Sequence, residues 1–392
     1  MEAGQGKLEV FITKKSIIRA INSLPKPQIL TLSNLDLLSG RFPVTYLYFY
    51  PNPEAASFTS IIESVKCSLA ETLSYYYPFA GRIVQNPVTA EPEIVCDNNG
   101  ALVVEGHANI SLKKLEFYNL NQCLQGKLVS ISPDFPLHVQ VTHYTCGGIS
   151  IAFNFDHALD IINMPTTNIL LKRLYHIDAS SINKLQHIAC ANGNKRTKIE
   201  AFSAYIWKIM VTAIDKKHER CKMGWLVDGR GRMHGAQDPM SDYIGNVLSV
   251  TVGEASVAEL KLGSISDIAA IVHETISKVT DEKHFQDLID WIECHRPGLM
   301  LPKIVLGRGG PAVVLSSGRR FPVAELNFGF GSPVLGTVCS TIEKIGVGYF
   351  NQRPSAQNDG SWTVSAILWP ELAAALESDP IFEPMSVNHL QL

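Results

Sequence analysis

Strand-like runs alternate with amphipathic helices along the whole chain, and this order constrains the possible folds more than any other feature. Residues 8–13, 138–144 and 149–155 alternate apolar and polar side chains with period two, which is typical of strands with one buried face. Residues 57–76 and 198–213 repeat their apolar side chains with helical spacing. The pattern predicts an α/β (α+β) fold, and a length of 392 residues suggests two domains.

The composition excludes several classes of protein. Hydrophobic residues make up 46% of the chain and charged residues 18%, which suits a large apolar core. A net charge of −3 without a basic block makes nucleic acid an unsuitable partner, and no apolar run is long enough to cross a membrane. The first sixteen residues lack the apolar core that is typical of a signal peptide, and the eight scattered cysteines match neither a disulfide framework nor a zinc site. We therefore expect a cytoplasmic protein without a metal.

Further elements follow from the same patterns. Residues 94–96 and 101–104 flank a turn-like Asp-Asn-Asn-Gly and predict a hairpin, and residues 257–279 predict one long helix. The remaining expectations are strands at 169–176, 312–315 and 361–368 and a helix at 371–378.

One histidine has a setting that suits catalysis. The runs 138–144 and 149–155 predict a hairpin whose second strand ends at Asp156-His157, with Asp160 close by. A neutral imidazole at a strand end can take a proton from a substrate hydroxyl and later give it to a leaving thiolate. We therefore expect His157 to be a general base.

The competing mechanisms have weaker signals. Neither a GxSxG elbow nor a phosphate-binding glycine loop occurs in the sequence. Cys146 is a possible nucleophile, but a small residue packed in a tight Cys-Gly-Gly turn is the favoured interpretation. Residues 327–331 (Asn-Phe-Gly-Phe-Gly) predict a structural bend more readily than a contact with substrate.

Several segments, taken together and in this order, resemble the signature motifs of the BAHD acyltransferases, a plant-type family. Phe155–Leu159 resembles the family's HxxxD motif, and Asn327–Gly331 resembles its DFGWG motif. Other matching segments are Leu32–Asp36, Tyr77–Arg82 (similar to PLAGR), Glu200–Trp207, Val227–Arg230 and Tyr243–Asn246. Within the family the chain looks most similar to the coniferyl alcohol acyltransferase branch, on the segments Phe285–Trp291, His295–Pro297 and Ser316–Pro322 and on Asn in place of Asp at position 327.

The resemblance implies two domains like chloramphenicol acetyltransferase, each a mixed β-sheet with flanking helices, at residues 1–160 and 161–392. It implies a channel between them, with His157 at its centre and with donor and acceptor entering from opposite faces. Acyl-CoA would be a co-substrate, an alcohol or phenol the acceptor, and no cofactor would be bound permanently. The protein would act as a monomer in plant specialised metabolism.

The resemblance also gives supporting roles to six residues of the site: Asp160, Arg230, Asn327, Gly329, Phe330 and Gly331. The family's motif Asp pairs with the arginine that Arg230 matches. Here Asp160 stands one residue early and Ile161 takes the motif position, a shift that redirects the side chain and could leave Arg230 unpaired. Phe330 replaces the usual Trp and cannot donate a hydrogen bond.

The chain is several dozen residues shorter than members of the family. The shortage falls between the histidine motif and Leu171–Tyr175, where members have a helix and a long crossover. We favour residues of the natural protein missing after Leu159 or Asp160 over a genuine deletion. An intact mass near 43.1 kDa would exclude missing residues.

Two positions bear on the acceptor. Pro43 stands where shikimate-type members have a histidine, whereas Arg320 matches the arginine that holds their acceptor's carboxylate. We favour an uncharged aromatic alcohol. Two other functions stay open: a non-catalytic or regulatory relative that keeps the ligand-binding scaffold, and a lyase that reuses the pocket without CoA.

Overall fold

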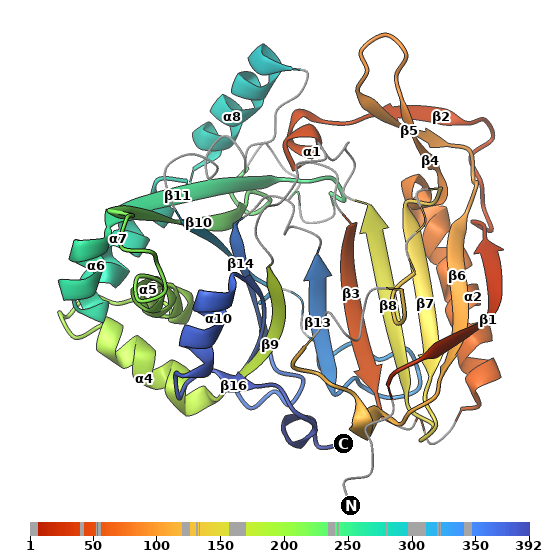
Figure 1. Ribbon diagram of the computed structural model, residues 1–392. Coiled ribbons are helices and arrows are strands. Elements are labelled where there is room, and N and C mark those ends of the chain that lie inside the picture. Colours follow the sequence, from red (N-terminus) through yellow and green to blue (C-terminus); the bar gives the residue numbers. More distant parts are fainter. Residues whose placement is uncertain are drawn as a thin grey trace, which may run out of the picture.

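Two lobes lie side by side in the computed structural model, each built on its own β-sheet (Figure 1). The structure describes residues 7–39, 43–51, 53, 56–119, 126–130, 132, 134–156, 170–233, 240, 243–279, 281–296, 311–319, 321, 323–340 and 347–392. This arrangement is the two-lobed α/β fold that the sequence predicts. Within these residues, no helix is both long and apolar enough to span a bilayer.

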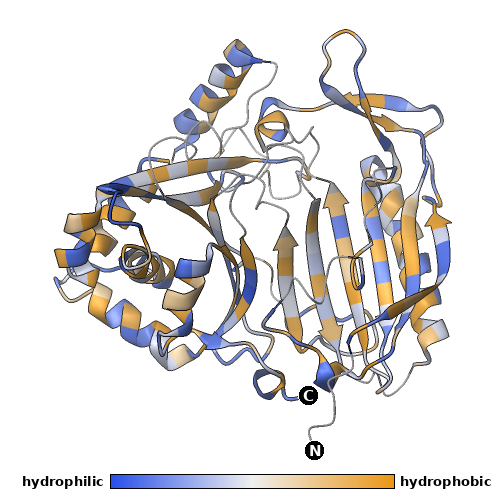
Figure 2. Ribbon diagram, in the orientation of Figure 1, coloured by the Kyte–Doolittle hydropathy of each residue, from blue (hydrophilic) through white to orange (hydrophobic). Residues whose placement is uncertain are grey.

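The first lobe contains a six-stranded sheet with the order β1-β6-β7-β8-β3-β13. The strands are β1 (Val10–Ile18), β6 (Ala101–Ala108), β7 (Leu137–His143), β8 (Ile149–Asp156), β3 (Pro43–Tyr50) and β13 (Leu335–Ser340). β6 and β7 are parallel, and the other neighbours are antiparallel. Hydrophobic and hydrophilic residues alternate along several of these strands (Figure 2). Helix α2 (Phe58–Tyr75) covers one face of the sheet with a stripe of buried aliphatic side chains.

A small three-stranded sheet stands beside the first lobe at one end of the molecule (Figure 1). It consists of β2 (Gln28–Thr31), β5 (Pro92–Cys96) and β4 (Arg82–Gln85), and β2 leads into the short helix α1 (Asn34–Ser39). Short 3-10 turns at Tyr77–Ala80 and Leu112–Lys114 complete this half.

The second lobe contains a seven-stranded sheet with the order β11-β10-β12-β14-β15-β9-β16. The strands are β11 (Leu248–Ser256), β10 (Arg220–Asp228), β12 (Ala312–Ser317), β14 (Gly348–Pro354), β15 (Trp362–Leu368), β9 (Leu171–Ile177) and β16 (Glu383–Pro384). The helices are α4 (Ala179–Ala189), α5 (Lys198–Met210), α6 (Val257–Leu262), α7 (Ile265–Ser277), α8 (Glu282–His295) and α10 (Pro370–Glu377), followed by a 3-10 turn at Val387–Leu390.

The two faces of the second sheet differ in polarity. Phe350 and Val364 point to the outer face, where they pack under the helices in the largest apolar core of the described chain. Tyr349, Asn351 and Arg353 alternate with Phe350 along β14 and point to the inner face, and all three are more than nine-tenths buried. Arg353 lies over the ring of Tyr46 of β3, so this inner face is in contact with the first lobe.

Strand β13 comes from the C-terminal half of the sequence but belongs to the first sheet. It pairs antiparallel with β3, from Leu335 opposite Phe49 to Ser340 opposite Val44. The division at residues 160 and 161 stays a prediction, because residues 157–169 lie outside the described part of the chain.

Two of the sequence predictions were wrong in detail. The segments 94–96 and 101–104 do not pair with each other, because β5 pairs with β2 and β4 whereas β6 pairs with β1 and β7. The helix predicted at 257–279 is two helices, because Ser264 begins a new one with a capping box to Asp267. The hairpin at 138–155 is confirmed by the antiparallel pairing of β7 with β8.

Candidate active site

Strand β8 ends at Asp156, directly before His157, the predicted general base. Asp156 pairs with Pro43, the first residue of β3, so Pro43 lies opposite the residue that precedes His157. His157, Asp160 and Arg320 lie outside the described residues, and their roles stay predictions.

Aromatic side chains surround this strand end. The Phe155 ring lies edge-on to Tyr46 of β3 at 6.0 Å and to Phe79 at 5.7 Å, measured between ring centroids. Phe153, two residues earlier on the same face of β8, lies 6.0 Å from Phe328. The side chains of Phe153 and Phe155, on the strand that leads up to His157, therefore belong to an aromatic cluster.

The Asn327–Gly331 segment forms a bend that its own asparagine holds together. Asn327 Oδ1 accepts hydrogen bonds from the backbone N–H of Gly329 at 2.8 Å and of Gly331 at 3.2 Å. Both glycines have positive φ, +90° and +106°, which other residues rarely adopt. Phe330 packs edge-on against Tyr50 at 5.1 Å. This geometry accords with a structural bend, and the effect of the segment on the site stays a prediction.

Arg230 is not unpaired, although the motif Asp is displaced in the sequence. Its Nη1 donates to Asp228 Oδ1 at 3.2 Å, its Nε to the carbonyl of Tyr243 at 3.0 Å, and its Nη2 to the carbonyl of Gly245 at 2.5 Å. A guanidinium has five N–H donors, so two remain after these bonds. Arg230 therefore has partners on its own side of the lobe interface, and two of its donors have no acceptor identified among the residues that the structure describes.

A carboxylate that had no role in the sequence prediction connects the two lobes next to Arg230. Asp36 of α1 accepts two hydrogen bonds from Asn246, which follows the residues that bind Arg230. The sequence gives a local signal for half of this arrangement, because Ser33 and Asp36 have the spacing of a capping box. It gives no signal for the other half, because 210 positions separate the two partners.

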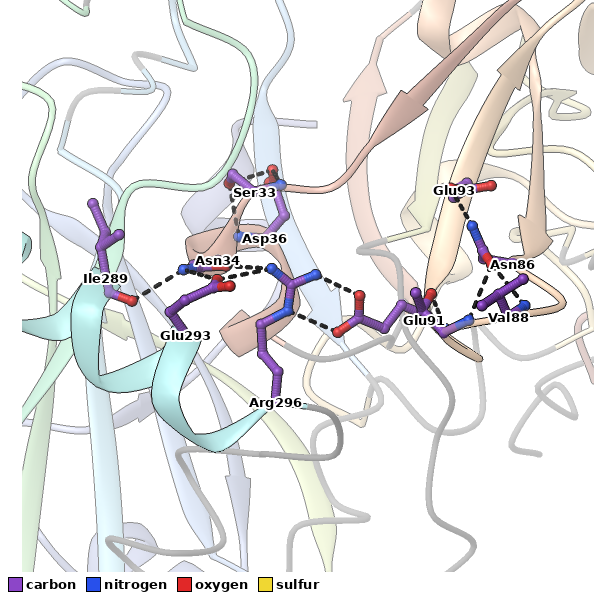
Figure 3. A network of polar contacts seen from close by, with 11 residues as sticks. Ser33, Asn34, Asp36, Asn86, Val88, Glu91, Glu93, Ile289, Glu293 and Arg296 are labelled. Carbon is purple, nitrogen blue, oxygen red and sulfur yellow. Dashed lines mark hydrogen bonds and ion pairs between the residues drawn. The ribbon is translucent and has the colours of Figure 1, made fainter.

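A second polar cluster between the lobes is drawn in Figure 3. Arg296, at the end of α8, binds both carboxylate oxygens of Glu91, with Nε to Oε1 at 2.8 Å, and donates from Nη1 to Asn34 Oδ1 at 3.0 Å. Asn34 donates in turn to the carbonyl of Ile289 at 3.0 Å. Helix α1 therefore contacts α8 directly, and the small sheet is tied to the second lobe.

A buried arginine completes the interface. The Arg353 guanidinium carbon lies 4.7 Å from the ring centre of Tyr46 and 5.5 Å from that of Phe321. Its Nε donates to Asn351 Oδ1 at 3.1 Å, and its Nη1 has no hydrogen-bond partner among the residues that the structure describes. Nearby, a small pocket between β13 and strands β9, β14 and β15 is lined by Lys172, Val338, Cys339, Tyr349, Ser365, Ala366 and Ile367.

Cys146 does not belong to this site. It lies in the turn before β8, and eight residues of strand separate that turn from the Asp156 end, about 25 Å at ~3.3 Å per residue. The thiol is exposed and its sulfur accepts from the N–H of Leu112 at 3.4 Å. In the described part of the chain, no three His, Cys, Asp or Glu side chains gather as metal ligands do.

Comparison with known proteins defines the class. The profile of the Transferase family matches residues 8–166 and 160–382, so its two segments meet where the sequence analysis places the shortage. The chain belongs to this family, the BAHD acyltransferases, and is an acyl-transferring enzyme.

Individual relatives are distant. The chain is 25% identical to anthranilate N-benzoyltransferase protein 1 of Dianthus caryophyllus, over 92% of this chain and 97% of the relative. That alignment spans 441 positions, more than the 392 residues of this chain, so it includes positions that this chain lacks.

Solved structures share the fold. Vinorine synthase superposes with a TM-score of 0.72 at 19% identity and covers 96% of this chain and 99% of its own. TRI101 of F. sporotrichioides, solved with coenzyme A and T-2, gives a TM-score of 0.70 at 16% identity and covers 90% and 98%.

Proposed function

We propose that this enzyme transfers an acyl group from a CoA thioester to the hydroxyl group of an uncharged aromatic alcohol, a phenylpropanoid of the coniferyl type. The observation that carries the proposal is the pairing of β8 with β3. In this pairing Asp156 lies opposite Pro43, and Asp156 is the residue that precedes His157 in the sequence. The aromatic cluster around Phe155 and Tyr46 supports an aromatic acceptor, because aromatic rings pack favourably edge-to-face.

In the proposed reaction, both substrates bind before chemistry begins. His157 removes the proton of the acceptor hydroxyl, and the resulting oxygen nucleophile attacks the thioester carbonyl. The tetrahedral intermediate collapses, the C–S bond breaks, and His157 gives its proton to the CoA thiolate. The acyl group then forms an ester with the acceptor, and the imidazole is neutral again.

Two further observations support the choice of substrates. A structure that shares this fold, that of TRI101, was solved with coenzyme A, which supports a CoA thioester as donor. Asn327 and the segments around Phe285 and Ser316 support the coniferyl branch of the family. We also propose a monomer in the cytoplasm.

The test is a screen of acyl-CoA donors against acceptors, read as release of free CoA thiol. Acetyl-, benzoyl- and hydroxycinnamoyl-CoA are paired with coniferyl-type alcohols, shikimate and anthranilate. We expect CoA release with an aromatic alcohol and a loss of about 10²–10⁴-fold in His157→Ala. His187→Ala is the matched control, because His187 is exposed on α4.

The same screen separates the alternatives. Faster turnover of anthranilate than of any alcohol would assign an amine acceptor, as the name of the Dianthus caryophyllus relative suggests. Ligand binding without CoA release would favour a regulatory relative, and cleavage of an ester in the absence of CoA would favour a lyase. Unchanged activity in His157→Ala would overturn the proposed base.

A further inference from the structure

The carboxylate of Asp36 binds hydrogen-bond donors from both lobes at once. Its Oδ2 accepts from the backbone N–H of Ser33 at 3.2 Å and from the Ser33 hydroxyl at 2.6 Å, which caps helix α1. Its Oδ1 accepts from the backbone N–H of Asn246 at 2.7 Å and from the Asn246 side chain at 3.1 Å. The side chain is 9% exposed, so these bonds replace water around a buried charge.

The segment 243–246 is held from two sides. Arg230 of the second lobe binds the carbonyls of Tyr243 and Gly245, and Asp36 of the first lobe binds the N–H groups of Asn246. The same few residues therefore connect the arginine that the family motif identifies with helix α1 of the other lobe.

Helix α1 is close in the chain to the strand end that leads to His157. It ends at Ser39, and Pro43 begins β3 opposite Asp156. Only three residues of chain separate the end of α1 from the first residue of β3. Asn34 and Arg296 hold the other side of α1 against α8, so the helix is fixed by the second lobe at two places (Figure 3).

We propose that Asp36 and Asn246 are a positioning pair, which sets the distance between the strand end that carries His157 and the Arg230 segment of the second lobe. The proposal rests on the proposed acyl transfer. Neither residue touches the reacting atoms; the pair acts through the backbone of 243–246 on one side and through α1 and β3 on the other. Its loss should therefore lower kcat more than it raises the KM of either substrate.

The chain contains a matched control for the capping role of Asp36. Asp267 makes the same capping box with Ser264 at the start of α7, with bonds of 3.0, 2.6 and 3.2 Å, on an exposed surface. Asp36→Ala and Asp267→Ala therefore remove the same local bonds, and only Asp36→Ala also removes the bond between the lobes. We expect kcat to fall about tenfold or more in Asp36→Ala and to stay within about twofold of wild type in Asp267→Ala.

A double-mutant cycle tests the pair directly. Asn246→Asp alone places two carboxylates against each other, so kcat should fall at least as far as in Asp36→Ala. In the double variant Asp36→Ala with Asn246→Asp this repulsion is absent, so kcat should be no lower than in Asp36→Ala alone. Equal kcat in Asp36→Ala and Asp267→Ala, or losses that simply add in the double variant, would overturn the proposal.

Hydrogen exchange gives a readout that needs no substrate. Amide exchange in 243–247 and in β3 should rise together in Asp36→Ala, and neither should change in Asp267→Ala. A wild-type protein that transfers no acyl group would contradict the proposed function, whereas exchange that rises in one lobe only would contradict the positioning pair.

Discussion

The guanidinium of Arg353 lies 4.7 Å from the ring centre of Tyr46, and the two residues belong to different sheets. Arg353 is 2% exposed and makes no ion pair with any residue that the structure describes. The positive charge is therefore stabilised at this interface by two aromatic faces and by the side-chain amide oxygen of Asn351.

This setting predicts that the volume of Arg353 matters more than its charge. Arg353→Met keeps most of the volume and removes a buried charge, so it should change the free energy of unfolding by less than about 1.5 kcal/mol. Arg353→Ala leaves a cavity between the sheets and should destabilise by about 2–4 kcal/mol. Chemical denaturation of both variants checks this, and equal losses would show that the charge itself is required.

Asn327 should be replaceable by Asp but not by Ala. Asn327→Asp keeps the oxygen that accepts from Gly329 and Gly331, so thermal stability should change little. Asn327→Ala removes both bonds and should destabilise by about 1–2 kcal/mol. The midpoints of thermal unfolding of the two variants test this prediction. Equal midpoints would contradict it.

Gly331→Ala should destabilise through backbone strain alone. A methyl group at Gly331 would meet no atom of the described residues within 4 Å, but its φ of +106° is strained for alanine. We expect a loss of about 1 kcal/mol or more in the free energy of unfolding. Gly193→Ala, on the surface with φ of +82°, is the matched control and should lose a similar amount.

The pair of Arg296 with Glu91 should contribute more than an ordinary surface ion pair. It is bidentate, and the exposed fractions of the two side chains are 30% and 14%. A double-mutant cycle with Arg296→Ala and Glu91→Gln should give a coupling of about 1–3 kcal/mol. The exposed pair of Arg220 with Glu254 should give less than about 1 kcal/mol in the same measurement.

Acidification should destabilise the protein through its half-buried histidines. Burial, and then the neighbouring His389, lower the pKa of His176, whereas Glu383, Asp359 and Asp178 raise it by smaller amounts. The unfolded chain then takes up a proton near pH 6.5 before the folded protein does, so stability is present above that pH and is lost as pH falls below it.

The same direction applies to two other histidines. Burial also lowers the pKa of His143, with His107 as the second cause, and that of His284. The midpoint of thermal unfolding should therefore fall between pH 7 and pH 5, and by less in His176→Gln. A flat profile across that range would contradict the assignment.

Local patterns in the sequence predicted the elements that depend on neighbours in the chain. The hairpin of β7 and β8 followed from period-two alternation around a Cys-Gly-Gly turn, and the structure pairs Val139 with Phe153 as such a hairpin requires. The break at Ser264 was missed because apolar spacing continues across it, although Ser264 and Asp267 have the spacing of a capping box.

Pairings between distant segments could not be predicted in this way. The parallel contact of β6 with β7 and the bond of Asp36 with Asn246 both join segments that local periodicity cannot connect. Family resemblance identified the segments that contain Asp36, Arg230 and Asn246, but it did not say which atoms meet. The structure shows which atoms of these three residues form hydrogen bonds. The role of His157 is predicted from the sequence alone.

The exchange of β13 into the first sheet has a consequence for synthesis on the ribosome. The first sheet is complete only after residues 335–340 have left the exit tunnel. Until then, the edge of β3 that pairs with β13 has no partner strand. A fragment that stops before β13 would keep that edge open and would be prone to aggregate. A gene cut between the two lobes would therefore separate β13 from the sheet to which it belongs.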